Sequence, residues 1–193
     1  MSRFLRAAVL LLFLASCVGA RFSAPRDLDN ACSIARERPK YLRAMQATER
    51  KWGIPIAIQM AAIHQESRFV GNARTPQRFV LGIIPMGRQS TAYGYSQALD
   101  GTWEEYQREE GGRRARRDRI EDATDFMGWY MTETRDRLGI PLTDVRNQYL
   151  AYHEGRSGYA RGTQNGKAWL LAVADRVAAR ADLYQRQLST CRL

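Results

Sequence analysis

The chain has 193 residues, of which 45% are hydrophobic, 10% aromatic and 26% charged. This length supports one sizeable hydrophobic core, and the composition excludes a disordered or repeat protein, so we expect a single domain. The formal net charge of +10 favours a polyanionic partner such as nucleic acid, but the N-terminal segment indicates a different compartment.

Residues 1–16 have the features of an export signal. Basic residues stand at the start, and a short uncharged apolar run follows them. The run is too short to cross a bilayer, which takes about 20 apolar residues. At its end, Leu14-Ala15-Ser16-Cys17 resembles the bacterial lipobox, in which cleavage leaves the cysteine as the first residue and its thiol is acylated.

We therefore expect a lipoprotein signal peptide at residues 1–16, lipid on Cys17 and a tether over residues 17–30. The alternative is an ordinary secretory peptide cut near Ala20, which would remove Cys17. Either cleavage places the protein in the cell envelope, on the periplasmic side, where a basic chain meets phospholipid head groups and anionic polymers rather than nucleic acid. Val18 is not the aspartate associated with inner-membrane retention, which favours the outer membrane.

Apart from Cys17, the chain has two cysteines, Cys32 and Cys191. An oxidising compartment favours a disulfide between them, although two separate thiols are the alternative. Such a bridge would close a loop of about 160 residues and stabilise the fold by about 2 to 5 kcal/mol.

The rest of the chain, residues 31–193, indicates one domain of the all-α class. Proline and glycine breaks and helical periodicity predict helices over residues 39–52, 55–69, 96–109, 114–138, 142–154 and 167–188. One β-like stretch, residues 79–84, lies in a long connection and predicts a small hairpin or lid. Five aromatic residues of the predicted helices are expected in the core: Trp103, Tyr106, Trp129, Tyr130 and Trp169.

An arginine-rich run over residues 113–119 precedes a group of acidic residues. We interpret it as a solvated helix face with ion pairs four residues apart, such as Arg117 with Glu121. An anion-binding patch is the alternative.

Glu66 lies at the end of an apolar helical stripe. Ile56, Met60 and Ile63 step along one face of the predicted helix 55–69, and Glu66 is the next residue on that face. Because burial of an ionised carboxylate is costly, it should raise the pKa of Glu66, as a general acid at neutral pH requires. On periodicity alone, Glu66 could equally cap the exposed helix end or pair with Arg68.

Three motifs in order carry a resemblance to a known family. Their sequences are Glu66-Ser67-Arg68-Phe69, Gly94-Tyr95-Ser96-Gln97 and Ala151-Tyr152-His153-Glu154-Gly155. They resemble the Glu-Ser, Gly-Leu-Met-Gln and Ala-Tyr-Asn-x-Gly motifs of the soluble lytic transglycosylases, a goose-lysozyme-like family, and together they span about half the chain. The resemblance implies a lysozyme-like fold and cleavage of peptidoglycan glycan strands with no metal or cofactor.

The resemblance also implies roles for individual residues. Glu66 would protonate the glycosidic oxygen between N-acetylmuramic acid and N-acetylglucosamine. It would then take the proton from the muramoyl 6-hydroxyl, which attacks the anomeric carbon and leaves a 1,6-anhydro end. Tyr152 would hydrogen-bond Glu66, Ser67 would support the same site, and Gln97 would hold the substrate.

The motifs depart from the family pattern at two places. His153 replaces the family asparagine, and it can donate a hydrogen bond as an amide does but, unlike an amide, is also ionisable. Tyr95-Ser96 follows Gly94 where the family has Leu-Met. Tyrosines beside glycines in loops are candidates for lining a sugar-binding cleft, and these are Tyr93, Tyr95 and Tyr159.

Two other functions remain open. A hydrolytic muramidase of the same fold would need a second carboxylate, and Asp100 and Glu104 are the nearest in the sequence. A peptidoglycan-binding lipoprotein without activity would bind sacculi and release nothing. A metalloprotease site is not supported, because His153-Glu154 lacks a second histidine four residues after His153.

Overall fold

The computed structural model describes residues 22–81 and 83–192. The expected signal peptide, the lipidation site Cys17 and the first part of the expected tether lie outside the described residues. Within the described ranges, no helix is long and apolar enough to span a membrane.

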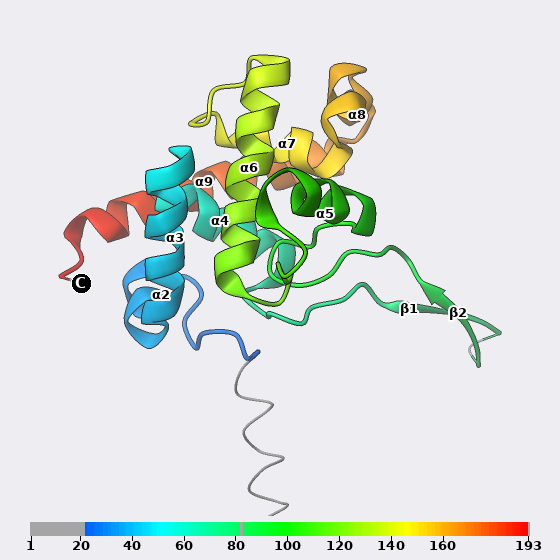
Figure 1. The fold of residues 1–193 in the computed structure, drawn as a ribbon, viewed down its shortest axis with the longest axis horizontal. Coiled ribbons are helices and arrows are strands. Elements are labelled where there is room, and N and C mark those ends of the chain that lie inside the picture. The colour runs from blue at the N-terminus through cyan, green and yellow to red at the C-terminus, as the bar shows by residue number, and fades with distance from the viewer. Residues whose placement is uncertain (1–21, 82, 193) are drawn as a thin grey trace, which may run out of the picture.

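The described chain is mainly helical with one small two-stranded sheet, which confirms the expected fold class (Figure 1). The longer helices are α3 (Pro39–Trp52), α4 (Ile56–Ser67), α6 (Ile120–Leu138), α7 (Val145–Glu154) and α9 (Ala168–Thr190). The shorter helices are α2 (Ala31–Glu37), α5 (Asp100–Tyr106) and α8 (Arg156–Ala160). A π-helical turn (Gln107–Gly111) extends α5, and a 3-10 turn (Thr163–Gly166) follows α8. Strands β1 (Gln77–Val80) and β2 (Ile84–Arg88) form an antiparallel hairpin.

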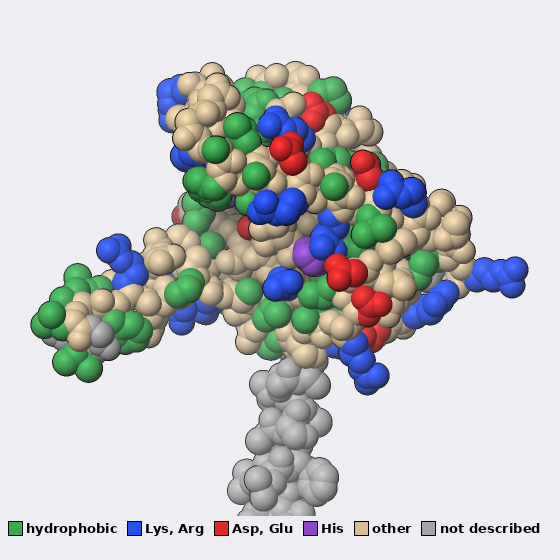
Figure 2. Space-filling view, turned by 180° about the vertical axis from the view of Figure 1, so that it is seen from behind, with side chains coloured by type: hydrophobic (Ala, Val, Ile, Leu, Met, Phe, Trp, Pro, Cys, Tyr) green, Lys and Arg blue, Asp and Glu red, His purple; other side chains and the backbone are tan. Residues whose placement is uncertain are grey.

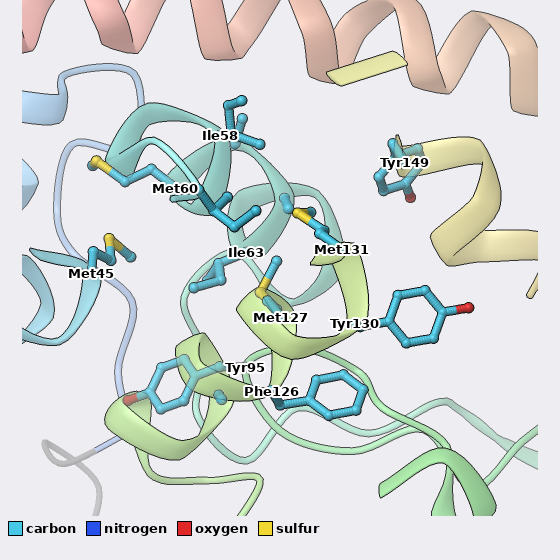
Figure 3. Packing of buried hydrophobic residues seen from close by; sticks show 14 of the residues in the cluster. Met45, Ile58, Met60, Ile63, Tyr95, Phe126, Met127, Tyr130, Met131 and Tyr149 are labelled. Atoms are coloured by element: carbon cyan, nitrogen blue, oxygen red, sulfur yellow. The ribbon is translucent and has the colours of Figure 1, made fainter. Parts of the chain in front are cut away.

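Helix α4 forms the centre of the core. Its sequence is apolar on nearly every face, and a helix of this kind is stable only when it is surrounded by protein. It packs against α9, while α3 packs against α6 and α7 packs against α9. Figure 3 shows the α4 residues among methionines of α3 and α6: Ile58, Met60 and Ile63 with Met45, Met127 and Met131.

The predicted helix over residues 114–138 is too long at its start, since α6 begins only at Ile120. The arginine-rich run before it forms a loop that folds back on the segment ahead of α5. There the Arg117 guanidinium lies 2.7 Å from Asp100 and donates to the Thr91 and Ala98 carbonyl oxygens, so the predicted pair with Glu121 is wrong. These contacts require Arg117 to lie outside a helix.

Four of the five expected core aromatics are buried, but Trp169 is 58% exposed. The residue that α9 turns inward at this point is Leu170, which is fully buried, so its neighbour Trp169 faces outward. The Trp169 indole meets the His153 ring edge-on, with 5.3 Å between their centroids.

The two ends of the described chain are joined. A disulfide links Cys32 of α2 to Cys191 after α9, with 5.8 Å between their Cα atoms. Gln187 of α9 strengthens the junction, because its side chain accepts from the Ala31 amide and donates to the Asp29 carbonyl oxygen.

Candidate active site

A cavity of about 360 Å³ brings the three sequence motifs together. Glu66 at the end of α4, Gln97 in the loop before α5, and Tyr152 and His153 of α7 all line it. The cavity therefore brings together side chains of three motifs that lie far apart in the sequence.

Glu66 is partly buried in the last turn of α4. Loss of water around the carboxyl group raises its pKa to about 7, and a hydrogen bond with Tyr149 opposes the rise. No ion pair to Glu66 occurs within the described residues. The group is thus divided between its acid and carboxylate forms near neutral pH, which is the requirement for both a general acid and a general base.

The hydrogen bond to Glu66 comes from Tyr149, not from Tyr152 as the resemblance implied. Tyr152 instead donates to the Ser96 carbonyl oxygen at 2.5 Å. The two tyrosines lie three residues apart on one face of α7, so one reaches α4 while the other reaches the loop that carries Gln97. Burial and the nearby Glu66 charge raise the pKa of both phenols, which keeps them neutral.

Gln97 is held by its own loop. Its side-chain nitrogen donates to the carbonyl oxygens of Ala73 and Gly94, at 3.0 and 2.8 Å. Its backbone has a φ of +49°, which is costly for a residue with a side chain and is often found at functional sites. The carboxamide oxygen accepts no hydrogen bond from any residue that the structure describes, and it can receive one from a substrate hydroxyl or amide.

Several predicted site residues support the fold and do not line the cavity. The Ser67 hydroxyl donates to the Ile63 carbonyl oxygen of its own helix. Gly94 has a φ of +82°, and a Cβ there would lie 2.1 Å from the Arg117 carbonyl oxygen, so only glycine fits. Both residues therefore fix the backbone around the site.

The three tyrosines expected to line a sugar-binding cleft do not line this cavity, so a role for them in sugar binding stays a prediction. Tyr95 is buried, and its hydroxyl is 2.9 Å from that of Tyr41 in the core. Tyr93 lies under the Arg74 guanidinium, 4.1 Å from its ring centroid. Tyr159 donates to the Asn147 side chain. Each of the three tyrosines contacts a polar side chain outside the cavity. The neighbouring glycines in the sequence gave no indication of these contacts.

Glu154 is a second carboxylate in the cavity wall, and the sequence analysis gave it no role. Its side chain is only 4% exposed and accepts hydrogen bonds from Lys167, at 2.7 Å to each oxygen, and from Thr163. The His153 Nδ1 lies 3.1 Å from it. These partners, above all the Lys167 hydrogen bond, lower the pKa of Glu154 to about 2. Glu154 therefore stays ionised, and its two oxygens stay hydrogen-bonded to these partners.

The two acids considered for a second catalytic role are not in the cavity wall. Asp100 pairs with Arg117 at 2.7 Å, and Glu104 is exposed on α5. Among the residues that line the cavity, the carboxylates are Glu66 and Glu154 alone. Within the described part of the chain, no group of three or more histidine, cysteine or acidic side chains could hold a metal ion.

The chain matches a known protein family. A family model described as a transglycosylase SLT domain matches residues 5–191, which is nearly the whole chain. None of the curated proteins matches the chain.

Proposed function

Because the chain belongs to the transglycosylase SLT domain family and has its lysozyme-like fold, we propose that it is a peptidoglycan lytic transglycosylase. It cleaves the β-1,4 bond between N-acetylmuramic acid and N-acetylglucosamine without water and leaves a 1,6-anhydro end. One observation carries this proposal. The cavity has one carboxyl group that titrates near neutral pH, Glu66, and the other carboxylate in its wall is held ionised.

In the first step, protonated Glu66 donates its proton to the glycosidic oxygen. The bond from this oxygen to the muramoyl anomeric carbon breaks, and the N-acetylglucosamine side leaves with a free 4-hydroxyl. The Tyr149 hydrogen bond, which favours the charged form of Glu66, stabilises the carboxylate that results.

In the second step, the Glu66 carboxylate takes the proton of the muramoyl 6-hydroxyl. The 6-oxygen then bonds to the anomeric carbon and closes the anhydro ring, while Glu66 regains its proton. A pKa of about 7 serves both steps, because the group gives and takes a proton at similar cost.

The state of Glu154 supports a reaction without water. Hydrolysis requires a second carboxylate, either as a nucleophile or as a base that activates water. Glu154 is a weak base with a pKa of about 2, and Lys167 contacts both of its oxygens. Its role in our proposal is to orient His153 at the cavity wall.

Three further groups are proposed to contact the glycan. The Gln97 carboxamide oxygen and the His153 ring lie in the cavity wall, where they can bond to acetamido and hydroxyl groups. The exposed Trp169 indole beside His153 offers an apolar face on which a sugar ring can stack.

The test is the release of soluble muropeptides from purified sacculi. We expect Glu66→Gln to lower the rate by at least about a thousandfold, since the residue serves as both acid and base. Glu104→Gln is the matched control, because it removes an exposed carboxylate outside the cavity and should retain full activity. Equal activity of Glu66→Gln and the wild type would refute the proposal.

We also propose that the protein is a lipoprotein of the outer membrane. Removal of residues 1–16 would leave Cys17 acylated, with residues 17–30 as the tether and residues 31–193 as the catalytic domain. The lipobox-like sequence and Val18 support this arrangement. The mass of the mature N-terminal peptide would test it, since a secretory cut near Ala20 yields a peptide with neither Cys17 nor lipid.

A further inference from the structure

The hairpin of β1 and β2 extends away from the body of the protein and exposes apolar side chains at its end (Figures 1 and 2). Leu81 is 84% exposed and Ile83 is 78% exposed. Phe79, Val80 and Met86 are exposed as well, whereas the other exposed large hydrophobic residues in the described part of the chain, Leu99 and Trp169, lie at the cavity or beside it. A two-stranded hairpin cannot bury such side chains by itself.

The connection that carries this hairpin tip, residues 74–93, is basic and contains no acidic residue. Its cations are Arg74, Arg78 and Arg88, and none of them forms an ion pair within the described ranges. Arg74 stacks on Tyr93, and Arg88 donates to the Thr75 carbonyl oxygen at 2.6 Å, so both are positioned but keep their charge. Figure 2 shows hydrophobic side chains at the end of the arm and Lys or Arg side chains nearer the body.

We propose that the hairpin tip inserts into an anionic phospholipid surface. An apolar end enters the acyl boundary of a bilayer, and the cations behind it meet the phosphate groups. The charge pattern favours this occupant over a second copy of the chain, because pairing two tips would bring four unpaired arginines together, Arg78 and Arg88 of each copy. The proposal is independent of the catalytic function.

The hairpin is fastened to the catalytic cavity. Thr75 and Ala92, one on each side of the hairpin, both line that cavity. The Thr75 hydroxyl donates to the Ser90 carbonyl oxygen at 3.0 Å, and Arg74 pairs with Tyr93 as an antiparallel bridge. Insertion of the tip would thus hold the cavity at a set distance from the lipid surface.

Vesicle binding by residues 22–193 tests the proposal. This form keeps the disulfide and all described buried members of the core cluster, which lie between Ala31 and Tyr184, so we expect it to fold without the N-terminal segment. We expect it to sediment with vesicles of phosphatidylethanolamine and phosphatidylglycerol, and less with phosphatidylcholine vesicles or at high salt.

Two sets of variants separate the apolar and the charged contributions. The double variant Leu81→Ser, Ile83→Ser should bind about tenfold more weakly, because it loses the inserted side chains. Arg78→Gln should bind about fivefold more weakly. Arg108→Gln removes the same charge from an exposed site outside the hairpin and should change binding less than twofold.

A fluorophore on Leu81→Cys gives an independent measurement, since the form has no other free thiol. Its emission should shift to the blue with anionic vesicles, whereas the same label on Gln185→Cys, an exposed position of α9, should not shift. Vesicle binding that the double variant retains, or no binding at all, would overturn the proposal. Self-association that depends on Leu81 would do so too. Glu66→Gln should bind vesicles as the wild type does, which separates this test from that of the catalytic proposal.

Discussion

The chemistry of Glu66 follows from its place at the end of a buried apolar helix. Burial removes the water that would stabilise its charge, and no cation of the described chain replaces that water. Glu154, in the same cavity wall, has the opposite environment, because Lys167 and Thr163 supply the hydrogen bonds that a carboxylate needs. The two environments separate the pKa values of the two acids widely, and for this reason we propose Glu66 as the group that exchanges protons.

Catalysis should depend on pH through the protonation of Glu66. Because the first step needs protonated Glu66, kcat/KM should fall as the pH rises through about 7. Tyr149→Phe removes a hydrogen bond that lowers this pKa, so the fall should move to higher pH. The profiles of both proteins can be measured on soluble glycan fragments. An unmoved or lower midpoint in Tyr149→Phe would contradict the assignment of this hydrogen bond.

The same pKa has a consequence for stability. The folded protein binds the Glu66 proton more tightly than the unfolded chain does, with a pKa of about 7 against 4.5. Ionisation therefore destabilises the fold as the pH rises from about 4.5 to 7, by about 2 to 3 kcal/mol. Glu66→Gln cannot ionise, so it should be more stable than the wild type at pH 8 and about equal at pH 4. Urea unfolding at both pH values measures the difference, and a Glu66→Gln protein that is less stable at pH 8 would refute the effect.

At the scale of single residues, the sequence could predict which motifs line the cavity but not which atoms contact each other. Glu66, Gln97 and Tyr152 do line one cavity. Tyr152 donates to the Ser96 carbonyl oxygen, so Tyr149 is the partner of Glu66. The position of a backbone carbonyl group in a loop cannot be predicted from the residue types, so the sequence could not distinguish the two tyrosines. Likewise, the pKa of Glu154 depends on Lys167, which belongs to a separate part of the chain.

The helix ends show where the secondary structure carries strain. Helices α3 and α6 end at Gly53 and Gly139, both in the left-handed region that glycine adopts at little cost. Helix α4 ends at Arg68 with a φ of +50°, and Phe69 follows with a φ of +62°. These two strained residues come directly after the Glu66-Ser67 pair. The surrounding structure therefore holds their backbone in a conformation that residues with a side chain rarely adopt.

A substitution at this helix end tests the strain. Arg68 is exposed, and Arg68→Gly should raise the free energy of unfolding by about 0.5 to 1 kcal/mol, because glycine adopts the left-handed conformation freely. Arg50→Gly, within α3, is the control and should lower stability by about 1 kcal/mol. Chemical denaturation measures both, and a destabilised Arg68→Gly would show that the side chain contributes more than its backbone costs.

The elements that the sequence predicted well are those with clear breaks. Pro39 and Gly53 bound α3 as predicted, and Pro55 directly precedes α4. The start of α6 was wrong, because Arg117 leaves the helical path to bind the segment before α5. Helices α2 and α8 have seven and five residues, too few to show a hydrophobic period.

At the scale of the whole molecule, the disulfide joins α2 to the end of α9 across 159 residues of sequence. Cys191→Ser should lower the free energy of unfolding by about 2 to 5 kcal/mol, since the unfolded chain gains the freedom that the closed loop denies it. Ser189→Ala is the control, because it changes an exposed residue near Cys191 and leaves the disulfide intact. Equal stability of Cys191→Ser and the wild type under oxidising conditions would mean that the bridge contributes nothing.

The most direct test of the central claim is to digest purified sacculi in water enriched in ¹⁸O and to weigh the new chain ends. We predict muramoyl ends that lack the mass of one water and carry no ¹⁸O, since the 6-hydroxyl takes the place of water. Glu66→Gln should form no such ends. New muramoyl ends that carry ¹⁸O at the anomeric carbon would show that water attacks there, and they would contradict a reaction in which Glu66 is the one acid and base.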